Sequence, residues 1–259
     1  MKRRAFVAAA AGSSLAATTA TAATPPQLLE LRKVRLRFGP METRYAEYAK
    51  DVLVPAMNRA GVKPIGAFTV SVGPDSPALY LLLPHPNAES IGALGARLGE
   101  DAEYRRAGAA FRGLPAGDPP YLRRESSLLL AFASVPSVEA PVGAAAAPSR
   151  VFELRTYESH SESAAAKKVE MFEGGGEIAI FRRVGITPVF FARDLVGPTL
   201  PSLTYMVVFP DMAAREKAWA AFREDEAWVK LRSTPGLSNA DIVSNIRSVL
   251  LRPAAYSQI

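Results

Sequence analysis

The sequence predicts an α+β protein made of two tandem ferredoxin-like domains, each with the element order βαββαβ. Two observations support this prediction. Short motifs recur in the same order in both halves of the 259-residue chain, and each half passes through the same succession of strand-like and helix-like segments. The first observation indicates an internal duplication, and the second gives the fold of each copy.

The duplication rests on five pairs of matching segments, offset by 121 to 126 residues. The pairs are LELR 29–32 with FELR 152–155, RAGVKPIGAF 59–68 with RVGITPVFFA 183–192, YLLLP 80–84 with YMVVFP 205–210, EDAEYRR 100–106 with EDEAWVK 224–230, and SLLL 127–130 with SVLL 248–251. Five matches in the same order are hard to obtain by chance, so we infer that one unit was duplicated.

Each copy is expected to open with a strand in which apolar and polar residues alternate, at 29–36 and 152–157. A helical stretch follows and ends at a glycine, Gly61 or Gly185, the residue that favours a helix C-terminus. Two apolar strands come next, then a helix that begins after Asn87 or Asp211, and then a closing strand. These remaining strands are expected at 68–72, 79–83 and 127–132 in the first copy, and at 189–193, 203–209 and 242–251 in the second.

The first helix of each copy is expected to be interrupted at the same level. Gly174, Gly175 and Gly176 break it in the second copy, and Pro55 lies near the equivalent point in the first. Exposed backbone N–H groups at such a break can hold an anion, but no Lys, Ser or Thr follows at P-loop spacing. We therefore favour a broken helix that lets another part of the backbone come close.

The composition divides the chain into a signal peptide at 1–23, a degenerate first domain at 28–133, a Pro/Ala-rich linker at 134–149 and a second domain at 150–253. A basic start, an Ala-rich run and an Ala-Thr-Ala end characterise the signal peptide. Its adjacent arginines, Arg3 and Arg4, resemble a twin-arginine export signal; an ordinary secretory signal is the alternative. We expect cleavage after Ala22 or Ala23 and a periplasmic or extracellular protein.

The charge balance excludes an electrostatic nucleic-acid binder. The formal charge is +6, and without Lys2, Arg3 and Arg4 it falls to +3, since 28 basic residues then face 25 acidic ones. The chain has no cysteine, which excludes disulfides, thiolate catalysis and cysteine-ligated metals. No run of about 18 apolar residues follows the signal peptide, so we expect no stable membrane insertion.

The second copy resembles the NIPSNAP family. The resemblance rests on the ELRTY strand at 153–157, the RRVG step before a strand, the LTYM strand and the helix containing DEAW, and it covers nearly all of 150–253. The first copy matches loosely, because LELRKVRL lacks the Thr-Tyr pair. The stretch Ser159-His160-Ser161-Glu162 also departs from the Pro-Gly that often follows ELRTY in that family.

The resemblance implies a dimeric α/β barrel, in which two ferredoxin-like sheets pack face to face, here as a pseudo-dimer within one chain. Proteins of that wider superfamily include small-molecule oxygenases, isomerases and haem enzymes. NIPSNAP proteins have no settled catalytic chemistry to carry over, so we predict no catalytic residue.

The candidate ligand-binding residues lie on the opening strands: Glu153, Arg155 and Tyr157 in the second copy, and Glu30 and Arg32 in the first. They alternate with apolar residues, and we expect the apolar side under the helices and the polar side facing the partner sheet. On that face an arginine could pair with an anionic or carbonyl group of a ligand. Alternatively, the four charges neutralise one another in an ion-pair network between the sheets, and we favour this second interpretation.

Other side chains offer little chemistry. His85 and His160 fall in loops without a partner at metal-ligand spacing, and we expect them at the surface, with no metal and no cofactor. Trp219 and Trp228 have the spacing of core or interface aromatics. The copies diverge most in their helices and loops, and we expect the second copy to carry any site.

Three functional hypotheses stay open. The first is a protein that binds a small molecule, or assembles, through the space between the sheets, with a homo-oligomer possible. The second is a cofactor-independent oxygenase or isomerase acting on a small carbonyl compound. The third is a purely structural oligomerisation module.

Overall fold

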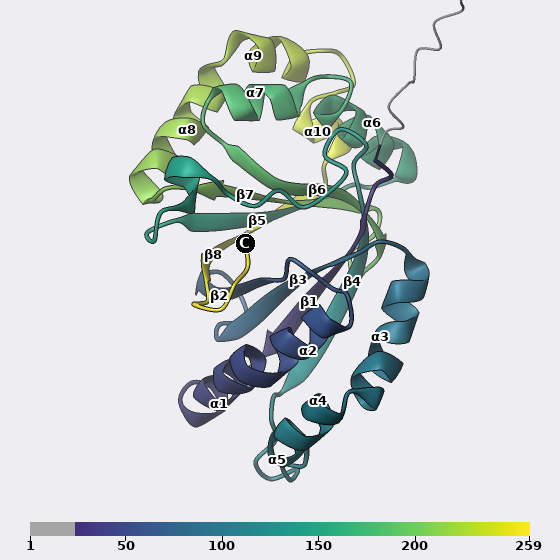
Figure 1. The fold of residues 1–259 in the computed structure, drawn as a ribbon. Coiled ribbons are helices and arrows are strands. Elements are labelled where there is room, and N and C mark those ends of the chain that lie inside the picture. Colours follow the sequence, from purple (N-terminus) through teal and green to yellow (C-terminus); the bar gives the residue numbers. More distant parts are fainter. Residues whose placement is uncertain (1–23) are drawn as a thin grey trace, which may run out of the picture.

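Eight strands close into a barrel in the computed structural model, which describes residues 24–259 (Figure 1). The order around the barrel is β1-β3-β2-β8-β5-β7-β6-β4, and all neighbours are antiparallel. The strands are β1 (Leu28–Arg35), β2 (Gly66–Val72), β3 (Ala78–His85), β4 (Arg123–Ala131), β5 (Val151–Glu158), β6 (Thr187–Val196), β7 (Ser202–Phe209) and β8 (Asn245–Pro253). The predicted signal peptide lies outside the described residues.

The helices cover the outside of the barrel, those of the first half on one side and those of the second half on the other (Figure 1). The first half has α1 (Pro40–Tyr48), a π-helical turn (Ala49–Leu53), α2 (Val54–Arg59), α3 (Ala88–Glu100), α4 (Ala102–Ala107) and α5 (Ala109–Arg112). The second half has α6 (Glu162–Phe172), α7 (Glu177–Arg183), α8 (Met212–Glu224), α9 (Glu226–Arg232) and α10 (Asn239–Ile242). The predicted α+β class, with two ferredoxin-like units forming one α/β barrel, is confirmed; the sheets join at their edges, β2 to β8 and β4 to β6.

The strand register aligns the two halves residue by residue. Leu129 lies opposite Leu29, and Leu251 lies opposite Phe152, so these two pairs correspond. The same register makes Tyr80 the counterpart of Thr204 rather than of Tyr205, because they face the equivalent residues Lys33 and Thr156. The motif match at the third strand was therefore shifted by one residue.

The helices that follow the third strands correspond equally well. Both α3 and α8 have 13 residues, and the side chains of Asn87 and Asp211 accept hydrogen bonds from backbone N–H groups in the first turn, as predicted for N-caps. This alignment makes Ile91 and Gly95 the counterparts of Arg215 and Trp219.

Apolar residues inside the barrel come from both halves. One buried cluster contains interior residues of both halves, among them Leu29, Phe68, Phe152, Leu154 and Leu251, and no helix residue. Two further clusters lie between the sheet and the helices, one in each half. The predicted orientation of the opening strands was therefore wrong, since their apolar residues line the barrel and their polar residues face the helices.

The first helix is irregular at the expected level in both halves, but only the helix of the second half is broken. In the second half α6 ends at Phe172 and α7 begins at Glu177, and an added Cβ on Gly175 would lie 2.7 Å from the carbonyl oxygen of Met171. This close approach agrees with the packing interpretation of the glycine run. In the first half the helix continues from α1 through the π-helical turn into α2, and Pro55 lies in the first turn of α2.

The connection at 134–149 is more ordered than a free linker. Val135 is 1% exposed and belongs to the helix-side core of the second half. The backbone N–H of Glu139 donates to the carbonyl of Val189 at 2.8 Å. The prediction of an unpacked linker was therefore wrong around Val135.

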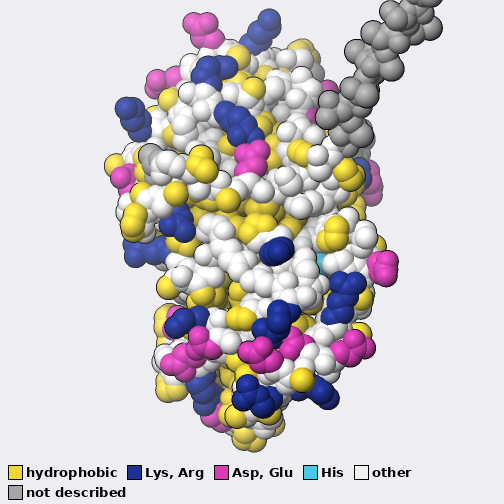
Figure 2. Space-filling model, viewed as in Figure 1, with side chains coloured by type: hydrophobic (Ala, Val, Ile, Leu, Met, Phe, Trp, Pro, Cys, Tyr) yellow, Lys and Arg dark blue, Asp and Glu magenta, His cyan; other side chains and the backbone are white. Residues whose placement is uncertain are grey.

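Acidic and basic side chains are interspersed on the face shown in Figure 2, where no field of a single sign appears. Within residues 24–259, no helix is long and apolar enough to cross a bilayer.

Candidate ligand site between sheet and helices

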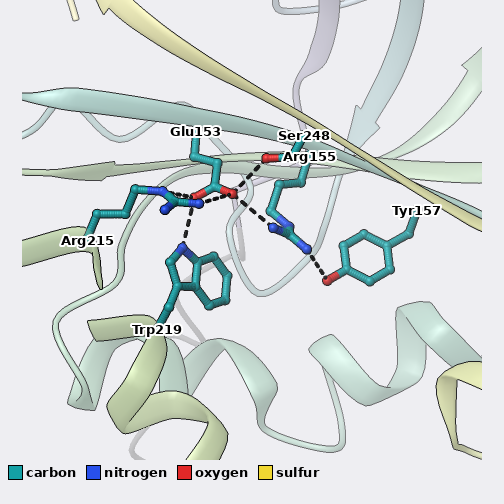
Figure 3. A network of polar contacts seen from close by, with 6 residues as sticks. All are labelled: Glu153, Arg155, Tyr157, Arg215, Trp219 and Ser248. Carbon is teal, nitrogen blue, oxygen red and sulfur yellow. Dashed lines mark hydrogen bonds and ion pairs between the residues drawn. The ribbon is translucent and has the colours of Figure 1, made fainter. Parts of the chain in front are cut away.

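Glu153 is the centre of the polar network in the second half (Figure 3). Its side chain is fully buried, and its carboxylate accepts five hydrogen bonds. The donors are Arg155 Nη1 at 2.9 Å, Arg215 Nε and Nη2 at 2.8 and 3.0 Å, Trp219 Nε1 at 2.8 Å and Ser248 Oγ at 2.8 Å. The network thus ties β5 and β8 of the sheet to α8 above it.

The ionised form of Glu153 is the stable one in this position. Burial alone would raise the pKa of the carboxyl, but the hydrogen bonds from Arg215 and the charge of Arg155 outweigh burial and lower the pKa. A buried carboxylate held by two guanidinium groups is satisfied, and it fixes the position of both arginines.

Arg155 lies in the middle of the network with hydrogen-bonding capacity to spare. Its Nη2 donates to the Tyr157 hydroxyl at 3.3 Å, while its buried Nε has no partner among the described residues. Its guanidinium carbon lies 5.0 Å from the ring centre of Trp219. The group remains charged: burial favours its neutral form, but the surrounding tyrosines and Glu153 outweigh burial and raise its pKa.

A cavity of about 560 Å³ opens directly beside this network. Its aromatic wall consists of Tyr157, Trp219, Phe222 and Trp228. Its charged residues are four arginines and one glutamate: Arg155, Arg215, Arg223, Arg232 and Glu216. The cavity therefore combines flat apolar surfaces with an excess of positive charge.

The first half has the equivalent cavity, which is also lined by three arginines and five aromatic side chains. It differs in the groups that bind its buried glutamate. It measures about 440 Å³ and lies between the sheet and α3. At the positions of Arg215 and Trp219 it has Ile91 and Gly95. Glu30 is bound there by Arg32, at 2.9 and 3.1 Å, and by Ser126 at 2.6 Å. One carboxylate and one arginine on the sheet thus recur in both halves, and the second arginine and the indole bind that carboxylate only in the second.

His85 is an unexpected neighbour of Glu30. It is fully buried at the end of β3, its Nδ1 lies 3.0 Å from Ser90 Oγ, and its Nε2 lies 3.8 Å from Glu30 Oε2. The expectation of a surface loop residue was wrong for His85, because the strand extends two residues past the predicted end. His160 is exposed, as expected.

The structure brings the predicted site residues together in part. Glu153, Arg155 and Tyr157 share one network, while Glu30 and Arg32 form a separate pair under the other helix layer. The predicted network between the sheets was wrong, since each glutamate pairs with the arginine of its own strand and Glu153 pairs in addition with Arg215 of α8. The residues missed were Arg215, Trp219 and Ser248; Arg215 and Trp219 are four apart on the helix after Asp211, which places them on one face.

Beneath the aromatic wall lies a second buried ion pair. Lys168 Nζ is 3.0 Å from Glu177 Oε2, and each residue is 1% exposed. The ammonium lies 4.7 to 5.4 Å from the ring centres of Phe172, Tyr157 and Trp228. Burial is the main influence on Glu177 and raises its pKa despite the neighbouring Lys168. In residues 24–259, no group of His, Asp and Glu side chains has the arrangement of a metal site.

A known family model matches the second half of the chain. The model of the NIPSNAP family covers residues 152–258, which include Glu153, Arg155, Arg215 and Trp219. The second half is a NIPSNAP domain. No curated protein matches the chain.

Solved structures resemble the whole barrel. A "putative monooxygenase" from Fusobacterium nucleatum is 10% identical, with a TM-score of 0.60 over 89% of this chain and 93% of its own. A "putative monooxygenase" from Lactobacillus acidophilus is 11% identical, with a TM-score of 0.60 over 89% and 95%. An uncharacterised NIPSNAP-like domain protein from Burkholderia xenovorans is 20% identical over 42% of this chain and 90% of its own, with a TM-score of 0.38. The first two likenesses support the fold of the NIPSNAP domain and its partner half.

Proposed function

We propose that the NIPSNAP domain binds a small anionic molecule with a flat apolar part in the cavity between β5, β8 and α8. The observation that carries this proposal is the pair Arg155 and Arg215, which are anchored on the buried Glu153 and also line the cavity. Because the buried carboxylate already fixes both guanidinium groups, a ligand loses little by ordering them. Their remaining N–H groups suit a carboxylate or an enolate oxygen.

The aromatic wall supports the flat apolar part of the ligand. The ring centres of Phe222 and Trp228 lie 4.5 Å apart at 29°, and those of Trp219 and Phe222 lie 5.7 Å apart at 82°. These rings already pack against one another and present fixed faces, which favours a planar group beside them. In the first half the buried glutamate holds one arginine and no indole, although Arg112 and Arg124 also line that cavity. We therefore place the pre-organised site in the second half.

A catalytic alternative follows from the same geometry. Arg155 Nη2 lies 3.3 Å from the Tyr157 hydroxyl oxygen, and both residues line the cavity. Together they can stabilise negative charge that develops on a carbonyl oxygen. The barrel likeness to two proteins called "putative monooxygenase" agrees with an oxygenase or isomerase acting on a small carbonyl compound. We rank binding first, because the carboxylate beside this pair, Glu153, is fully buried and already accepts five hydrogen bonds.

The tryptophans report directly on the proposed site. Trp219 and Trp228 are the two tryptophans of the chain, and both line the cavity, so their fluorescence can be titrated with non-fluorescing ligands. Phenylacetate, 2-phenylethanol and phenethylamine share a ring and differ in charge. Phenylacetate should bind at least about tenfold more tightly than 2-phenylethanol, and Arg155→Gln should remove that advantage, because a charged hydrogen bond contributes about 1.5–3 kcal/mol.

The matched control is Arg32→Gln, which changes the equivalent arginine of the first half and should leave the titration unchanged. If phenylacetate binds no better than 2-phenylethanol, or if both arginine variants weaken it equally, the proposed site is wrong.

We also propose that the protein is exported by the twin-arginine route. Cell fractionation should find a mature chain that begins after Ala22 or Ala23 outside the cytoplasm, and replacing Arg3 and Arg4 by lysine should retain the precursor inside. Unchanged export of the double-lysine variant would instead indicate an ordinary secretory signal.

A further inference from the structure

The barrel has a second cavity at one of its ends, away from the helices. It measures about 520 Å³ and has an apolar floor that includes Leu31, Tyr80, Leu154 and Val249, all on strands. The two hairpin turns of the duplicated units, at 73–77 and 197–201, both contribute lining residues at this end. Towards the opposite end the interior is filled, with the rings of Phe68 and Phe152 at 4.7 Å and Ile259 buried beside them. The cavity is therefore a blind pocket inside the barrel.

Most charged groups at this pocket neutralise one another. Lys33 Nζ lies 2.8 Å from Asp75 and 2.9 Å from Glu125, and Arg247 lies 2.6 Å from Glu158. Arg35 also pairs with Asp75 and with Glu125, so these two acids are balanced by two basic side chains. Of the three acidic side chains that line the pocket, one is therefore left without a basic partner.

The remaining acid is Asp194 on β6, which forms no ion pair within residues 24–259. Its Oδ2 accepts hydrogen bonds from Ser202 at 2.6 Å and from Thr204 at 3.0 Å. Its Oδ1 is buried and accepts none. A buried carboxyl group with one oxygen unsatisfied costs free energy that a bound donor would recover.

The first half shows that the architecture does not require this acid. Asp194 pairs with Leu129 on β4, and Val70 pairs with Leu251 on β8. Leu129 and Leu251 are equivalent, and each pair lies next to a shift in strand register, so Val70 is the counterpart of Asp194. Val70 is apolar and packs against the interior cluster. The second half therefore has a carboxyl group, that of Asp194, at the position where the first half has the apolar side chain of Val70.

We propose that this open end of the barrel is a second binding site, which takes a small molecule with an ammonium group and an apolar body. The ammonium group pairs with Asp194 and the apolar body lies on the floor formed by Leu31, Leu154 and Val249. Val196 lines the pocket and is exposed, as are Val72 and Leu200, which lie next to or within the two hairpin turns. This charge preference is opposite to that of the cavity beside Arg155, so one panel of ligands tests the two sites separately.

Calorimetric titration of the mature protein with phenethylamine, 2-phenylethanol and phenylacetate tests the site. We expect phenethylamine to bind at this end at least about tenfold more tightly than 2-phenylethanol, and Asp194→Asn to remove that advantage. Asp194→Val copies the first half and should fold with an unchanged or higher melting temperature while it loses amine binding. Arg155→Gln should leave amine binding intact, and Asp194→Asn should leave the tryptophan response to phenylacetate intact.

Two results would overturn the second site. One is the absence of saturable phenethylamine binding by the unsubstituted protein at millimolar concentration. The other is equal affinity of phenethylamine for the unsubstituted protein and for both Asp194 variants, which would place the amine elsewhere. Neither result bears on phenylacetate at the tryptophans, so failure here is distinguishable from failure of the first site.

Discussion

Lys168→Met and Glu177→Leu should each destabilise the protein by about 3–5 kcal/mol, whereas the double substitution should be close to neutral or stabilising. Each single change leaves one charge buried without its partner, since both side chains are 1% exposed. The double change leaves two apolar side chains of similar length among Phe172, Tyr157 and Trp228. Burial raises the pKa of Glu177 despite the neighbouring Lys168, which is the direction expected where burial disfavours the charged form.

Denaturant titration of the three variants measures the effect, and in thermal melts each 1 kcal/mol corresponds to about 2–4 °C for a protein of this size. The exposed pair Arg182 and Glu139, at 2.7 Å, is the matched control, and Arg182→Met should cost less than about 1 kcal/mol. Additive losses in the double variant would show that the pair contributes net stability, contrary to this expectation.

Glu153→Gln should cost about 3–5 kcal/mol in the free energy of unfolding, and Glu30→Gln should cost less. Glu153 neutralises two arginines and accepts the indole N–H, whereas Glu30 accepts from a single arginine and a serine. The amide keeps the shape of the side chain but leaves Arg155 and Arg215 without their counter-charge. Chemical denaturation of the two variants, which change equivalent positions, compares the networks directly; equal losses would contradict the special role of the second half.

The same carboxylates predict the direction of acid unfolding. For Glu30, burial alone would raise the pKa, but His85 and Arg32 outweigh it and lower the pKa to about 2; the pKa of Glu153 is also lowered. A group whose folded pKa lies below its unfolded pKa contributes stability in full above the unfolded value, and that contribution disappears as the pH falls through the folded value. Stability should therefore decline from about pH 4.5 downward, and less steeply in the two glutamine variants.

Sequence periodicity predicted the strands because alternation and internal repetition are local properties. The opening strands lie within a residue or two of their predicted bounds. Asn87 and Asp211 cap their helices as predicted. The same alternation could not say which face meets the helices. In a closed barrel covered by helices both faces of a strand are buried, so a polar face is not a solvent face.

The site residues from other elements were harder to predict. Arg215 and Trp219 become partners of Glu153 only when α8 crosses over β5, a contact between residues more than 60 positions apart. Ser248 had been matched to Ser127, yet the register pairs it with Ser126, and both equivalent serines donate to the strand glutamate. Asp194 was not singled out, because a single acid at a strand end reads as a surface residue until closure of the barrel encloses it.

Because the barrel closes within one chain, the cavity beside Arg155 and the pocket at Asp194 can change independently of the matching positions in the other half. In a symmetric dimer a substitution appears twice and must be tolerated in both subunits at once. In this chain the two halves can differ at equivalent positions. Val70 corresponds to Asp194 and Gly95 corresponds to Trp219, and each of these residues can be substituted alone. One chain can therefore hold an acid-lined pocket and an arginine-lined pocket on the same framework, each adjustable without disturbing its twin.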